Sequence, residues 1–171
     1  MRTAVVVLAL GGCVLAGCGT GTGGGVPSAG TTSTTAATSP APTTVSVGSA
    51  LATATTAEQD ARAAYEAVIG KFGVVEPFPA IAAQETRHIE ILDHLAARHG
   101  VALPTGPITA TAPPATIKAA CQLGARTEAH LVSLYARLIA EVPVHPDLVK
   151  AFGDLRAAAR VHALPAFERC A

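Results

Sequence analysis

The sequence predicts an all-α protein, an up-down four-helix bundle that follows an N-terminal signal and a disordered linker. Four stretches within residues 56–171 place apolar residues at the three- and four-residue spacing of amphipathic helices. The composition is rich in alanine, which favours helix, and it contains no tryptophan. No stretch shows a convincing strand-like alternation of apolar and polar residues.

Composition also limits the classes of function. The chain has 171 residues and zero formal net charge, and only 14% of its residues are charged. A nucleic-acid partner is not expected, because the sequence has no basic patch and few aromatic residues for base stacking. The predicted folded part, residues 56–171, is long enough to bury about two-thirds of its unfolded surface in one core.

The N-terminus has the features of a bacterial lipoprotein signal. Residues 1–17 combine Arg2 with an apolar run that is too short for a membrane span of about 20 residues. The run ends in Leu-Ala-Gly-Cys, which resembles a lipobox, so Cys18 is expected to carry the lipid and begin the mature protein. A weaker match ends at Cys13, and an ordinary cleaved signal peptide is the alternative. The lipid would anchor the protein at the outer face of the cytoplasmic membrane, in the cell envelope.

Residues 18–55 are predicted to be a disordered linker. After Cys18 they are mostly Gly, Thr, Ser, Ala and Pro, without periodicity and with almost no large apolar side chains. Such a segment cannot bury enough surface to offset the entropy lost on ordering. We therefore expect a flexible tether between the membrane and the folded domain.

Four helices are expected after this linker. Their expected positions are residues 56–72, 79–98, 115–141 and 146 to the C-terminal region. Thr56 can cap the first helix and Gly73 can end it, while Pro146 suits the start of the fourth. Pro165 should kink the last turn of the fourth helix, because proline has no N–H to donate. The helices are expected to follow an alternating path.

Each predicted helix places polar residues on its inner face. These residues are Glu58, Glu85, His88, Glu128 and His162. A buried ionised carboxylate costs several kcal/mol unless it is paired, neutralised or bound to a metal. Taken singly, each has an ordinary explanation, such as pairing with Arg62 or Arg126. Together, carboxylates and imidazoles from four helices favour a shared iron, manganese or zinc site, because these metals accept mixed oxygen and nitrogen ligands.

The same segments resemble a known family. Residues 58–65, EQDARAAY, are similar to the opening helix of rubrerythrin-type ferritin-like proteins. Three further segments resemble a bacterial ferritin-like domain family of unknown function: residues 63–92, 123–131 and 152–170. The resemblance covers nearly all of the predicted domain and implies a ferritin-like bundle with a possible di-iron, manganese or zinc site. The ligands that it implies are Glu58, Glu85, His88 and Glu128.

The fourth helix departs from the family pattern. If His162 is the histidine of a fourth-helix Glu-x-x-His, the carboxylate belongs at position 159, which is Ala159. Half of a dinuclear site then lacks a ligand. The sequence therefore leaves three alternatives open: a site with one metal ion, a site with a weakly bound second ion, or a site without metal. In the first helix Glu66 is the alternative to Glu58. Glu66 is closer to the expected level of Glu85 along the bundle axis, but it lies about 80° from the centre of the inner face.

Two cysteines fall in the predicted domain, Cys121 and Cys170. They lie at the same end of an up-down bundle, and an oxidising envelope permits a disulfide between them. The bridge would close a loop of about 50 residues and stabilise the fold by roughly 4 kcal/mol. Two free buried thiols are the alternative.

Two functions fit these observations. The first is an envelope lipoprotein whose ferritin-like domain binds iron or a similar metal, in metal oxidation or oxidative-stress defence, with enzymatic activity left open. The second is a metal-free bundle that serves as a structural or binding module of the envelope. The expected partners are the membrane and metal ions, and no protein partner is indicated.

Overall fold

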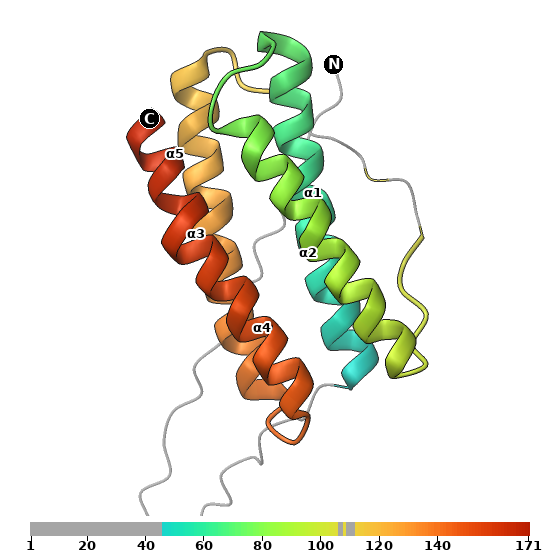
Figure 1. Ribbon diagram of the computed structural model, residues 1–171. Helices are drawn as coiled ribbons and strands as arrows, with labels where there is room; N and C mark the ends of the chain where they lie inside the picture. Colours follow the sequence, from blue (N-terminus) through green and yellow to red (C-terminus); the bar gives the residue numbers. More distant parts are fainter. Residues whose placement is uncertain (1–45, 106–107, 109–111) are drawn as a thin grey trace, which may run out of the picture. The chain divides into compact units, whose positions relative to one another are not determined.

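Four helical segments make up the part of the chain that the computed structural model describes, residues 46–105, 108 and 112–171 (Figure 1). They are α1 (Val47–Phe72), α2 (Phe78–Arg98), α3 (Ile117–Glu141) and α4 (Pro146–Ala158), which continues through the π-helical turn η1 (Ala159–Ala163) into α5 (Leu164–Cys170). These residues contain no strand, so the predicted all-α class is confirmed. Among the described residues, no helix is both long and apolar enough to cross a membrane. The predicted signal peptide and lipidation site lie outside the described residues.

Helix α1 begins earlier than its amino-acid pattern suggests. It starts at Val47, and the Ser46 side chain caps it by accepting a hydrogen bond from the Ser49 N–H at 3.1 Å. The predicted start at Thr56 is therefore wrong, and residues 47–55 of the predicted linker are helical. Their composition resembles a linker because small residues prevail, yet Ala50, Leu51 and Ala54 are fully buried.

The predicted alternation of helix directions is also wrong. The short connection of residues 73–77 makes α1 and α2 antiparallel. Arg98 at the end of α2 contacts Asp147 at the start of α4 at 3.4 Å. At the opposite end, Lys71 near the end of α1 donates to the Pro114 carbonyl, just before α3, at 2.7 Å. Helix α3 therefore begins at the end of the bundle where α2 also begins, and the two run in the same direction (Figure 1).

Pro165 changes the register of the last segment. It has no backbone N–H, and the hydrogen bonding just before it widens from the α to the π type in η1. Buried positions then recur at every fourth residue: Leu155, Ala159, Ala163 and Phe167. An uninterrupted α-helix would turn His162 inward, whereas the π turn leaves it exposed. The predicted inward position of His162 is therefore wrong.

The predicted disulfide between Cys121 and Cys170 is confirmed. It joins the start of α3 to the end of α5, with the two Cα atoms 5.5 Å apart. Next to it, Phe167 lies so close over Gly124 that an added Cβ would come within 2.5 Å of the ring. The same ring packs against Tyr65, with the ring centroids 5.0 Å apart. The end of α5 is thus held by one covalent bond and by close aromatic packing.

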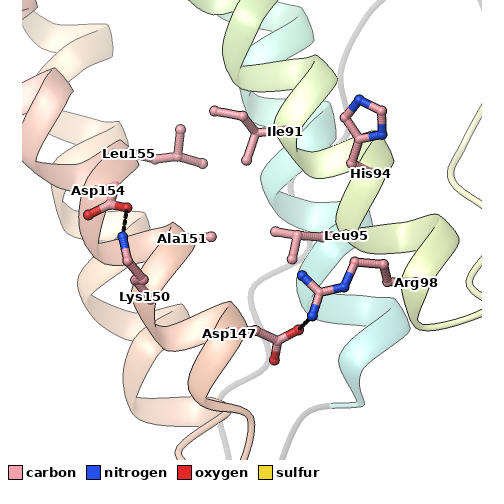
Figure 2. Close-up of a pocket in the computed structure, with 9 residues that line it drawn as sticks. All are labelled: Ile91, His94, Leu95, Arg98, Asp147, Lys150, Ala151, Asp154 and Leu155. Carbon is pink, nitrogen blue, oxygen red and sulfur yellow. Dashed lines mark hydrogen bonds and ion pairs between the residues drawn. The ribbon is translucent and has the colours of Figure 1, made fainter.

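A groove of about 350 Å³ lies between α2 and α4 (Figure 2). Ile91 lines it from α2 and Leu155 lines it from α4, so part of its wall is apolar. The contact between Arg98 and Asp147 lies at its lower end in the figure. Helices α2 and α4 are packed less closely than α1 and α2. The bundle is therefore more open on its α2–α4 side.

Candidate metal centre

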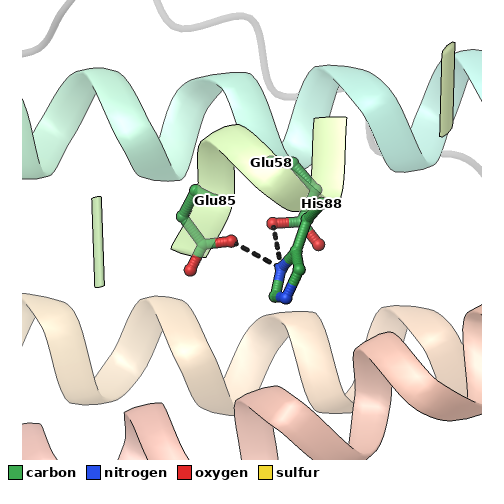
Figure 3. Close-up of side chains that lie close together, drawn as sticks. All are labelled: Glu58, Glu85 and His88. Atoms are coloured by element: carbon green, nitrogen blue, oxygen red, sulfur yellow. Dashed lines mark hydrogen bonds and ion pairs between the residues drawn. The ribbon is translucent and has the colours of Figure 1, made fainter. Parts of the chain in front are cut away.

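Three polar side chains from α1 and α2 meet inside the bundle (Figure 3). Glu58, Glu85 and His88 are 1%, 0% and 7% exposed, and each offers a ligand atom within 4.8 Å of those of the other two. The three-residue spacing of Glu85 and His88 puts both on one face of α2, toward Glu58 of α1. Across the described part of the chain, this is the one group of three acidic, histidine or cysteine residues close enough to share a metal ion.

The imidazole connects the two carboxylates. His88 Nδ1 lies 2.9 Å from Glu85 Oε2 and 3.5 Å from Glu58 Oε2. Within the described residues, one oxygen of each buried glutamate has no hydrogen-bond partner: Glu58 Oε2, Glu85 Oε1 and Glu128 Oε2. A buried acceptor without a partner costs about 1–3 kcal/mol, and more when it is charged. A cation bound among these oxygens would offset that cost.

Glu128 lies on α3, where it joins the cluster through a reciprocal pair of tyrosines. The hydroxyl of Tyr65 on α1 donates to Glu128 Oε1 at 2.6 Å, and the hydroxyl of Tyr135 on α3 donates to Glu58 Oε1. Each tyrosine follows the glutamate of its own helix by seven residues. Antiparallel α1 and α3 therefore place each tyrosine beside the glutamate of the other helix.

Tyr65 and Tyr135 belong to the site, although they were not predicted as members of it. The signal available was the repeated spacing, a glutamate followed seven residues later by a tyrosine, in the first and third helices. Burial, together with the nearby carboxylate charges, raises the pKa of both tyrosines above the ordinary value. They therefore remain protonated hydrogen-bond donors that hold the carboxylates in place.

Burial also determines how the cluster holds protons. Burial, reinforced by the charge of Glu58, raises the pKa of Glu85 to about 9 and the pKa of Glu128 to about 7. Burial alone would lower the pKa of His88, but the neighbouring carboxyl groups of Glu58 and Glu85 raise it to about 9. Glu58 is the exception: burial opposes its ionisation, yet the neighbouring His88, Glu85 and Tyr135 side chains lower its pKa. A metal ion would have to displace the protons of Glu85 and His88.

The structure selects Glu58 rather than Glu66 as the first-helix member of the cluster. The Glu66 side chain is 60% exposed and lies 3.6 Å from Arg62. Arg62 is therefore not the partner of Glu58, and Arg126 forms no salt bridge with any described residue. The arginine pairs that would explain buried carboxylates in a metal-free bundle are absent from the described residues.

The fourth helical segment adds no ligand to the group. Its inward positions at this level are Ala159 and Ala163, which are 2% and 1% exposed and have no donor atom in their side chains. His162 is exposed. Three of the five predicted ligands are thus brought together, Glu128 lies nearby on α3, and His162 does not reach the site.

Comparisons of this chain with family models, with curated proteins and with solved structures find no match. The function proposed below therefore depends on the geometry of the cluster.

Proposed function

We propose that this protein is a metal-binding helical bundle in which Glu58, Glu85 and His88 hold a transition-metal ion. The observation that supports this most directly is the buried group itself, whose ligand atoms lie within 4.8 Å of one another. Each of its carboxylates also has an oxygen without a hydrogen-bond partner in the described residues. Buried carboxylates are costly unless they hold protons or bind a cation.

The chain path supports a ferritin-like arrangement of the bundle. Ferritin-like bundles contain one long crossover connection, and here the connection from α2 to α3 joins opposite ends of the molecule. The order of ligands also agrees: a glutamate on α1, Glu-x-x-His on α2 and a glutamate on α3. A complete di-iron site would need a further glutamate and histidine, and the fourth segment has Ala159 and the exposed His162 there.

The donor set indicates the class of metal. Carboxylate oxygens with one imidazole nitrogen suit iron(II), manganese(II) or zinc better than calcium or magnesium. A redox-active ion would supply electron transfer, which fits metal oxidation or oxidative-stress defence. The residues of the chain provide binding and positioning: Tyr135 orients Glu58, Tyr65 orients Glu128, and burial keeps water away.

The location that we propose is the cell envelope, with a lipid on Cys18 anchoring the domain to the membrane. The lipobox-like sequence before Cys18 supports the anchor. The Cys121–Cys170 disulfide supports an oxidising compartment.

Metal content by mass spectrometry, on protein purified without a histidine tag, tests the proposal. We expect bound iron, manganese or zinc, and stabilisation against heat when metal is added to chelator-treated protein. The stabilisation should approach about 2.7 kcal/mol at a free metal concentration of 100 times Kd. The variant Glu85→Gln with His88→Gln should lose both effects, whereas Glu66→Gln, which alters an exposed glutamate of α1, should keep them.

The competing structural module makes the opposite prediction. Protein that contains no metal and gains no stability from Fe(II), Mn(II) or Zn(II) would overturn the proposal. In that case Glu85→Leu with His88→Leu should be neutral or stabilising, because apolar groups of similar volume avoid the cost of burying charges.

A further inference from the structure

We propose that the cluster holds one metal ion rather than two, and that the alanines of η1 set this number. The inference rests on the proposed function, because it concerns the same site. It specifies the stoichiometry and which helices provide the ligands: α1 and α2 bind the ion, while η1 provides only an apolar wall.

The ligand count is the first step. Dinuclear carboxylate sites in bundles use four carboxylates and two histidines drawn from four helices. Here the buried ionisable side chains of the described residues are three carboxylates and one imidazole: Glu58, Glu85, Glu128 and His88. Only Glu58, Glu85 and His88 have ligand atoms within 4.8 Å of one another. A second ion would have Glu128 as its only unshared protein ligand, and that carboxylate already accepts a hydrogen bond from Tyr65.

The level of η1 relative to α2 is the second step. Arg98 and Asp147 are in contact at 3.4 Å, so they mark one height on the antiparallel α2 and α4. Glu85 precedes Arg98 by 13 residues and Ala159 follows Asp147 by 12 residues (98 − 85 and 159 − 147). At about 1.5 Å per residue, the two positions differ in height by about 2 Å. Ala159 is therefore the position from which a fourth carboxylate could reach the cluster.

The register of η1 is the third step. The π turn before Pro165 directs Ala163 into the core and leaves His162 and Arg160 exposed. The segment therefore presents neither a carboxylate nor an imidazole to the cluster. Two methyl groups, those of Ala159 and Ala163, occupy the inward positions where ligands of a second ion would be needed.

The test is a titration of the chelator-treated, full-length protein with Co(II), followed by its visible absorption. We expect the absorption to saturate at one equivalent and Glu128→Gln to leave this endpoint at one. Saturation of the unaltered protein at two equivalents would overturn the single-ion inference and leave the proposed function intact. Absence of binding would overturn the proposed function itself.

Two added carboxylates test the role of η1. Ala159→Glu should raise the endpoint from one to two equivalents, because it supplies a fourth carboxylate at the height of Glu85. Ala151→Glu places the same residue two turns nearer the start of α4, and its endpoint should stay at one. An endpoint of one for a folded Ala159→Glu, with helicity checked by circular dichroism, would overturn the assignment to η1. If that variant does not fold, the endpoints of the unaltered protein and of Glu128→Gln still decide the stoichiometry.

Discussion

The two halves of the bundle place their polar and stabilising features differently. The half formed by α1 and α2 contains Glu58, Glu85 and His88, whose buried charges and unpaired oxygens oppose folding. The half formed by α3 and the α4–η1–α5 segment is mostly apolar at the same level and is held at one end by the Cys121–Cys170 disulfide. The disulfide thus lies in the half that has fewer ligands, and its stabilisation offsets part of the cost of the buried site.

The largest effect that would test this contrast is the pH dependence of the metal-free protein. Glu85, Glu128 and His88 all have raised pKa values, about 9, 7 and 9, so the folded state binds more protons than the unfolded state between pH 5 and 9. These groups stabilise the fold fully when the pH is below their pKa values in the unfolded chain. This stabilisation is lost as the pH rises through their pKa values in the folded protein. We expect the free energy of unfolding to fall by several kcal/mol, on the order of 5, from pH 5 to pH 9.

Urea unfolding of chelator-treated protein across this range measures the effect. The lowered pKa of Glu58 acts below its ordinary value of 4.5, so it does not offset the trend in this range. Glu85→Gln with Glu128→Gln should flatten the profile. Added metal should reverse the trend, because it binds more tightly as the ligands lose their protons. A flat profile in the unaltered, metal-free protein would contradict a buried protonated cluster.

The next largest effect concerns the other half. Replacing Cys121 and Cys170 by alanine removes the disulfide that links α3 to α5. The two cysteines are 49 residues apart in the sequence. The chain-entropy estimate for such a loop is a loss of about 4 kcal/mol. Thermal unfolding would measure it, and reduction of the unaltered protein should give a similar loss. If the α1–α2 half alone binds the ion, the double variant should still bind one equivalent while folded.

The smallest effect compares two glycines within helices. A Cβ at Gly124 would meet the Phe167 ring at 2.5 Å, whereas a Cβ at Gly153 would meet nothing within 4 Å. Gly124→Ala should therefore destabilise the fold by about 1–3 kcal/mol through overpacking. Gly153→Ala should stabilise it by up to about 1 kcal/mol through helix propensity. Urea midpoints for the two variants would decide, and equal shifts of the same sign would contradict the close packing of Phe167.

Several features of the site could be predicted from the sequence because they are local. Glu85 and His88 share a helix face by their spacing alone, and the inner positions of Glu58 and Glu128 follow from the apolar residues around them. All four are buried in the structure. The prediction failed for His162 because it continued the α-helical period through residues 159–163, where the structure has the extra residue of a π turn.

Four features follow from the amino-acid sequence alone: the helical class, the approximate helix positions, the inward face of each of the first three helices, and the pair of cysteines. These depend on periodicity and on residue type within a few turns. Tertiary structure decided the direction of α3, the reciprocal pairing of Tyr65 and Tyr135 with Glu128 and Glu58, and the alanine wall of η1. Each of these depends on how helices distant in sequence are aligned, and that alignment is set by packing and by the connection between α2 and α3.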